Sequence, residues 1–90
     1  MRYAVIWLHS LNDRLADVYL QARRRRESAA AVTAASARID SLLRRDPLAV
    51  GESRGPDYRM LIDPPLSVTY EVHEEERVVA VVDVRYLSRR

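Results

Sequence analysis

The sequence contains no cysteine, no lysine and no phenylalanine, and only two glycines among its 90 residues. Without cysteine the chain has no disulfide, no thiolate metal site and no cysteine nucleophile. Its two histidines, His9 and His73, are far apart in sequence, so a histidine-rich metal site is not expected either. We therefore expect neither a metal nor any other cofactor.

Long apolar segments are also missing. No run approaches the roughly 18 consecutive apolar residues of a membrane span, and the first residues lack the charged and then apolar pattern of a signal peptide. We therefore expect a cytoplasmic protein without membrane contact.

The charges are numerous but nearly balanced. All 15 basic residues are arginine, against 13 acidic residues, for a net charge of +2. A GC-rich genome explains a preference for arginine codons, yet each guanidinium still offers a planar fork that suits phosphate or carboxylate. A nucleic acid or an acidic partner is compatible with this composition, although the net charge does not demand one.

A chain of this length, 48% hydrophobic, makes one domain with a single core. Residues 3–8 predict a strand with apolar side chains on both faces, covered on both sides for much of its length. Apolar residues at helical spacing then predict helices over 11–24 and from about 28 to 46, before Pro47. The short connection between the helices predicts an antiparallel hairpin.

Four consecutive arginines, residues 23–26, fall where the first helix is expected to end. Positive charge is favourable there because the unpaired carbonyls carry the negative end of the helix dipole. A phosphate-binding patch is the alternative interpretation.

Strict alternation of apolar and polar residues marks 66–73 as a strand with one face on the core. A slip of one residue would bury Glu71 and His73 together, so the alternation fixes which face is buried. We expect the core face to hold Leu66, Val68, Tyr70 and Val72, and the open face to hold Ser67, Thr69, Glu71 and His73.

Two further strands flank this one. In 58–63 the residues of one parity are Tyr58, Met60 and Ile62, and we expect Tyr58 to pack in the core with Arg59 on the opposite, open face. Pro64 and Pro65 predict a tight turn into the strand that follows.

The last strand follows the acidic turn at 74–76 and is rich in valine. Because Val79 and Val81 share the parity of Asp83 and Arg85, we expect both of its faces to be apolar. A partner chain or self-association would cover the excess apolar surface.

These elements predict an α+β two-layer sandwich of order β-α-α-β-β-β. A helical hairpin should pack on one face of a mainly antiparallel four-stranded sheet.

The order of elements, together with the stretches IDSLLRRDPLAVGESR, YRMLIDPPLSVTYEV and RVVAVVDVRYL, resembles the RelE/ParE superfamily of bacterial toxins. The resemblance runs from Tyr3 to about Tyr86. It implies a single toxin domain over 1–90, belonging to a type II toxin–antitoxin module and masked by a cognate antitoxin. RelE-like members cleave mRNA on the ribosome, whereas ParE-like members poison DNA gyrase. Homodimerisation is a further expectation.

The same resemblance implies the candidate catalytic residues Arg59, Arg85 and Tyr86. Arg59 matches a basic position of the second strand, and Arg85 and Tyr86 stand near a catalytic arginine and a later aromatic residue of the nucleases. Leu61 and Ser67 occupy positions where the nucleases carry cations. The catalytic set is therefore incomplete.

Cleavage of RNA by its 2′-hydroxyl needs a base, an acid and cations that stabilise the phosphorane charge. Arg59 and Arg85 must then lie on one open face, near a single phosphate, with a proton carried by Glu71, His73 or Tyr86. Asp63 and Asp83 share the parity of these arginines and would pair with them. A degenerate, non-catalytic binding protein of this superfamily and an unrelated interaction domain remain alternatives.

Overall fold

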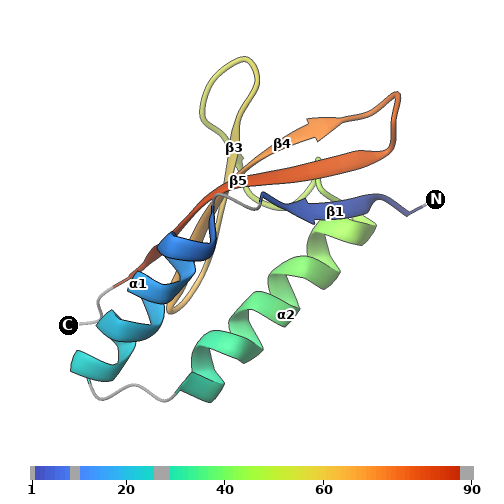
Figure 1. Cartoon of the computed structure of the whole chain (residues 1–90). Helices are drawn as coiled ribbons and strands as arrows, with labels where there is room; N and C mark the ends of the chain where they lie inside the picture. Colours follow the sequence, from blue (N-terminus) through green and yellow to red (C-terminus); the bar gives the residue numbers. More distant parts are fainter. Residues whose placement is uncertain (1, 9–10, 26–28, 88–90) are drawn as a thin grey trace.

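Two helices pack on one face of a five-stranded mixed sheet (Figure 1). The computed structural model describes residues 2–8, 11–25 and 29–87. In chain order the elements are β1 (Ala4–Trp7), α1 (Asn12–Arg24), α2 (Ala29–Arg45), β2 (Glu52–Ser53), β3 (Arg59–Asp63), β4 (Leu66–His73) and β5 (Val78–Tyr86).

The α+β class and the helix layer are confirmed, but the expected four-stranded sheet is wrong. The strand order is β1-β5-β4-β3-β2, with β1 parallel to β5 and the remaining pairs antiparallel. The fifth strand, β2, comes from the segment 46–57, which holds both glycines and two of the four prolines. It forms because the chain turns back along the edge of β3, where the N–H of Arg54 donates to the carbonyl of Tyr58 (2.8 Å).

Strand β4 lies at the centre of the sheet, and its alternation is confirmed for most positions. Leu66, Val68 and Tyr70 are fully buried, and His73 is exposed. Ser67 is the exception, since it is only 7% exposed although it lies on the open face. In register it sits between two longer side chains, Ile62 of β3 and Arg85 of β5, which cover it.

The expected faces of β3 are reversed in the structure. The tight turn at Pro64–Pro65 pairs Asp63 with Leu66 and Arg59 with Tyr70, and paired residues share a face of the sheet. Arg59 therefore lies on the helix side, while Tyr58 is 44% exposed and not part of the core. Ile62 is 52% exposed on the open face.

A bulge between Thr69 and Tyr70 changes the parity of β5. Tyr70 pairs with Val81 and Thr69 pairs with Asp83, which leaves Val82 as the additional residue. Val79, Val81 and Val84 are consequently all buried under the helices, while Val78 and Ala80 lie on the opposite face together with Asp83 and Arg85.

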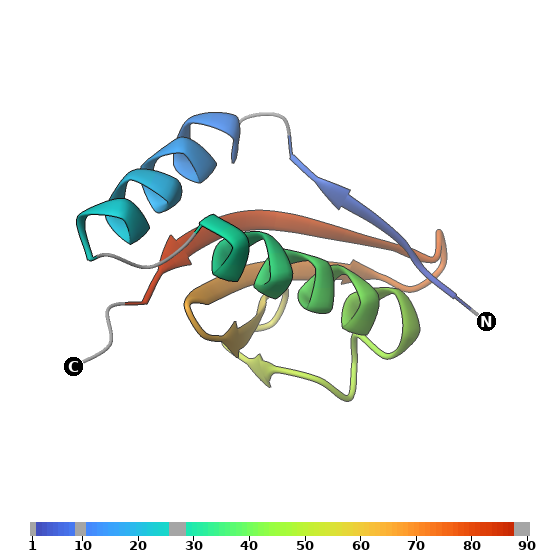
Figure 2. The same ribbon diagram turned by 90° about the horizontal axis from the view of Figure 1, so that it is seen from below.

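Helix α2 lies over the strands of the sheet (Figure 2), and each helix buries a stripe of side chains at helical spacing. Val18 and Ala22 of α1 pack near β5, and α2 contributes Val32, Ala35, Ile39 and Leu43 to the same core. The position of α2 is fixed further by Arg38, whose guanidinium donates two hydrogen bonds of 2.9 Å to the carboxylate of Asp63 in β3.

Strand β1 contacts α2 through side chains of its helix-facing side. Trp7 donates its indole N–H to Asp40 (3.2 Å), and Arg44 donates to the other oxygen of the same carboxylate (2.7 Å). Ile6 on the opposite side is 48% exposed. The expectation that β1 is covered on both faces is therefore wrong, because no described element packs over its open side.

Gly51 provides a test of how closely the loop packs on the sheet. Its φ is +74°, and a Cβ atom there would lie 2.7 Å from the Met60 carbonyl oxygen and 2.8 Å from the Tyr70 hydroxyl. We expect Gly51→Ala to lower the free energy of unfolding by more than about 2 kcal/mol, since left-handed backbone alone costs roughly 1–2 kcal/mol. Gly55 also has a positive φ (+152°), but nothing lies within 4 Å of a Cβ there. Gly55→Ala therefore carries backbone strain without a clash and should cost less in a urea titration. Equal losses would contradict this packing.

Candidate functional site

The phenol of Tyr70 anchors the loop after α2 to the sheet. Its hydroxyl lies 2.8 Å from the carbonyl oxygens of both Pro47 and Val50, and its single proton serves one of them at a time. Arg59 donates from Nε to the same hydroxyl (3.4 Å) and from Nη2 to the carbonyls of Val50 and Gly51 (3.3 Å each). Arg59 thus holds the loop after α2 against the sheet, and it also borders a surface groove.

Burial raises the pKa of the Tyr70 phenol above its usual value of 10.0, and the nearby Arg59 guanidinium partly opposes this shift. The neutral phenol is the form that the folded state favours. It is also the form that can donate to the loop carbonyls.

Arg59 borders a groove of about 380 Å³ beyond the point where β3 stops pairing with β4, which we call the β4 groove. One wall is the end of β4, and the other is the loop that leads into β3. The groove is lined by Leu48, Ser53, Gly55, Pro56, Asp57, Tyr58, Arg59, Glu71, Val72, His73 and Glu74.

Glu71 and His73 bring acid–base chemistry to this groove. A ring nitrogen of His73 lies 3.2 Å from a carboxylate oxygen of Glu71. Asp57 and Glu74 add two exposed carboxylates, so the acidic groups outnumber the guanidinium of Arg59. The sequence suggests Glu71 and His73 as proton carriers, but their position in one groove with Arg59 is visible only in the fold.

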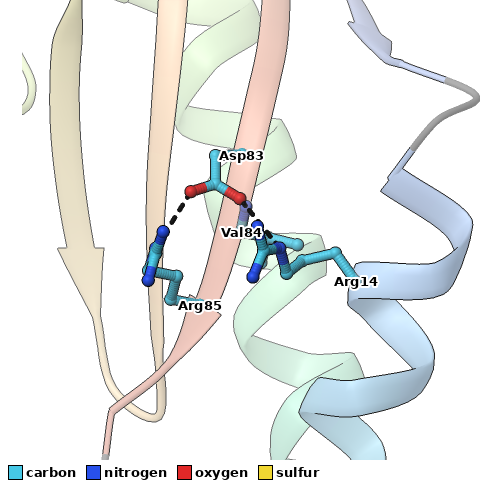
Figure 3. A network of polar contacts seen from close by, with 4 residues as sticks. All are labelled: Arg14, Asp83, Val84 and Arg85. Atoms are coloured by element: carbon cyan, nitrogen blue, oxygen red, sulfur yellow. Dashed lines mark hydrogen bonds and ion pairs between the residues drawn. The ribbon is translucent and has the colours of Figure 1, made fainter.

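Arg85 lies elsewhere, on the open face near the end of β5 (Figure 3). Its Nε donates to Asp83 (3.0 Å), and Arg14 of α1 reaches the second oxygen of the same carboxylate (3.2 Å). The expected pairing of Asp83 with Arg85 is confirmed. The expected partner of Arg59 was Asp63, but that carboxylate binds Arg38.

Tyr86 pairs with Leu66, so it lies on the helix side of the sheet and packs against the core. Together with Arg14, Arg85 and the α1 residues Asp17, Val18 and Gln21, it borders a small hollow of about 150 Å³. It does not line the β4 groove.

The three candidate catalytic residues are therefore not brought together. Arg59 and Arg85 lie on opposite faces of the sheet and on the two strands that flank β4. Strand spacings of about 4.8 Å and rises of about 3.3 Å per residue separate their backbones by roughly 14 Å. Their catalytic role stays a prediction, but the expectation that they share one open face is wrong.

The arginine run is placed at the C-terminal end of α1, as the helix-dipole interpretation expects. Arg23 and Arg24 occupy the last turn and Arg25 caps it, while Arg26 lies outside the described residues. Arg24 and Arg25 border a shallow hollow with Asp17, Leu20 and Gln21.

An apolar depression between the two helices was not anticipated from the sequence. Two adjoining hollows of about 370 and 470 Å³ share Tyr19, whose hydroxyl lies 3.0 Å from the Thr33 hydroxyl across the helix pair. Leu20 at its border is 49% exposed. We call this surface the helix groove; its apolar lining is Trp7, Leu15, Ala16, Tyr19, Leu20, Ala29 and Ala37.

Among residues 2–8, 11–25 and 29–87, no group of three or more His, Asp or Glu side chains is arranged to hold a metal ion. None of the helices in these segments has the length and apolarity needed to cross a membrane. Neither family models nor curated proteins yield a match to this sequence.

The Tyr70 anchor gives a pH-dependent test. A raised folded-state pKa contributes stability that is fully present below the unfolded value of about 10 and is lost as the pH rises through the folded value. We expect Tyr70→Phe to be destabilised by about 1–3 kcal/mol at pH 7, because buried carbonyls lose a donor. The difference in free energy of unfolding between Tyr70→Phe and wild type should narrow above about pH 10.

Urea unfolding between pH 7 and pH 11 measures both effects. Tyr19→Phe is the matched control, since its hydroxyl is exposed and bonds only to Thr33 among the described residues. If the difference in unfolding free energy between Tyr70→Phe and wild type stayed constant across this range, the role of the Tyr70 hydroxyl as a buried donor to the loop would be contradicted.

Proposed function

We propose that this chain is the toxin of a type II toxin–antitoxin module and that it arrests growth by binding a target such as DNA gyrase, not by cleaving mRNA. The toxin assignment draws on the resemblance to the RelE/ParE superfamily. The α+β fold with its helical hairpin is compatible with that resemblance. The separation of Arg59 from Arg85 is the observation that carries the choice of mechanism.

During RNA cleavage the phosphorus is bonded to both the attacking and the leaving oxygen, and cations must converge on it to stabilise the negative charge. Arg59 and Arg85 face opposite sides of the sheet, so one phosphate cannot contact both. Each guanidinium is also engaged within the chain, Arg59 by the loop carbonyls and Arg85 by Asp83. These contacts favour a structural role for both arginines.

The β4 groove does not replace the missing constellation. Glu71 and His73 could exchange a proton there, but Asp57, Glu71 and Glu74 surround the groove with negative charge. These carboxylates repel the phosphate backbone of a nucleic acid. Such a backbone binds proteins mainly through Lys and Arg side chains that neutralise its charge. The groove therefore disfavours RNA.

The helix groove suits the antitoxin. Its surface is mainly apolar, with Arg23 and Asp40 among its lining, and it extends along α1 from Leu15 to Leu20. An amphipathic helix laid into an apolar groove is a common mode of peptide recognition. We assign this surface to an apolar helical segment of the antitoxin.

Induced expression separates the toxin from the degenerate alternative and tests the mechanism. We expect growth arrest by the wild type and equal arrest by the double variant Arg59→Gln, Arg85→Gln, with no ribosome-dependent mRNA cleavage in either. Loss of a cation that stabilises a transition state typically costs about 10²–10³ in rate. Relief of toxicity in a folded double variant, checked by circular dichroism, would restore the nuclease mechanism. Absence of arrest by folded wild type would favour the degenerate protein.

The antitoxin surface has its own test. Leu20→Glu places a charge on the apolar helix groove, and we expect it to weaken binding of the protein encoded beside this gene at least tenfold while toxicity persists. Asp17→Asn on the same helix is the control, because Asp17 does not line the helix groove. Titration calorimetry with the purified pair measures both. Unchanged binding by Leu20→Glu would exclude this surface.

A further inference from the structure

The sheet face opposite the helices carries an apolar centre that no described helix covers (Figure 1). Ile6 and Ile62 are the most exposed of its residues, at 48% and 52%. Between them lie partly exposed side chains of the inner strands, which the pairing registers place on the same face: Met60, Thr69, Val78 and Ala80. We call this surface the open face.

The two ends of the open face carry opposite charge. Arg85 lies at one end, where it and Arg14 share the single carboxylate of Asp83 and so leave an excess of positive charge. At the other end stand Glu71 and, in the turn that follows β4, the exposed Glu74. Along β4 the position opposite Arg85 is Ser67, four residues from Glu71, with Thr69 midway.

We propose that the open face binds a second copy of this chain, in a two-fold symmetric, face-to-face pair of sheets. A two-fold axis that lies between the sheets, runs across the strands and passes near Thr69 superimposes apolar centre on apolar centre. It also brings Arg85 of each copy over the Glu71 end of the other. The same patch then serves both copies, as an isologous interface requires.

Charge selects this arrangement over the alternatives. An axis parallel to the strands would set Arg85 against Arg85 and Glu71 against Glu71, which is repulsive. An anionic membrane or a nucleic acid would be repelled by the acidic end. A fitting partner must place negative charge over the Arg85 end and positive charge over the Glu71 end. A second copy rotated about the axis that runs across the strands does so.

The size of the open face indicates how strongly two copies should associate. Six residue steps along β4 and four strands across give a patch of about 20 by 19 Å, hence on the order of 800 Å² of planar area over two copies. That is below the roughly 1,200 Å² of most stable interfaces. The dimer should therefore form at micromolar concentrations and dissociate on dilution.

Sedimentation equilibrium of the full chain between 1 and 300 µM tests the proposal by charge exchange. Arg85→Glu and Glu71→Arg should each shift the wild-type dimer to monomer, with a dissociation constant at least tenfold higher. An equimolar mixture of the two variants should dimerise again, because each altered residue then meets its complement and each native residue keeps its own. A folding defect in either variant would not be rescued by mixing.

Ala34→Arg, which adds a charge at an exposed position of α2 on the other side of the sheet, is the control and should leave the dimer intact. A wild-type chain that stays monomeric up to 300 µM would overturn the proposal. A dimer that survives both reversals, or two monomeric variants that fail to associate when mixed, would overturn it as well.

Discussion

The pairing of β4 with β5, and its single bulge after Thr69, is the constraint on which the arrangement of this molecule depends. Before the bulge the residues of β5 that face the helices are Val79 and Val81, and after it they are Val84 and Tyr86. If Val82 were a regular strand residue and not a bulge, strict alternation from Val79 would turn Asp83 and Arg85 toward the helices. Their charges would then be buried with few partners, at a cost of several kcal/mol per ion. The bulge instead keeps this charged pair on the open face and the valines in the core.

How far the sequence predicts this fold differs from strand to strand. The alternation of β4 is strong because every second residue from Leu66 to Val72 is apolar, and its buried face followed directly. In β3 hydrophobicity alone pointed to the wrong face, since Tyr58, Met60 and Ile62 look more apolar than Arg59, Leu61 and Asp63. The tight turn between Asp63 and Leu66 overrides that preference by fixing the register. The bulge and the two-residue strand β2 leave no pattern of their own, and the parallel pairing of β1 with β5 joins segments at the two ends of the sequence.

The candidate site shows the same division between what residue types predict and what register decides. The family resemblance pointed to Arg59 and Arg85, and side-chain chemistry pointed to Glu71 and His73 as proton carriers. Neither located the acceptors that occupy the two guanidinium groups. The loop carbonyls reach Arg59 only because Tyr70 draws residues 47–50 onto the sheet. Contacts of this kind join positions 8 to 23 residues apart, so local spacing does not reveal them.

A two-layer sandwich of this size leaves apolar surface on both outer sides. Two helices cover one face of five strands, and no third layer is available to cover the other, because a short chain buries a smaller fraction of its surface than a long one. The helix groove lies on the helix side of the sheet and the open face lies on the other side, so the two surfaces point away from each other. Two copies joined through their open faces would present both helix grooves outward. Self-association and capture by a masking helix are then compatible, and the second need not displace the first.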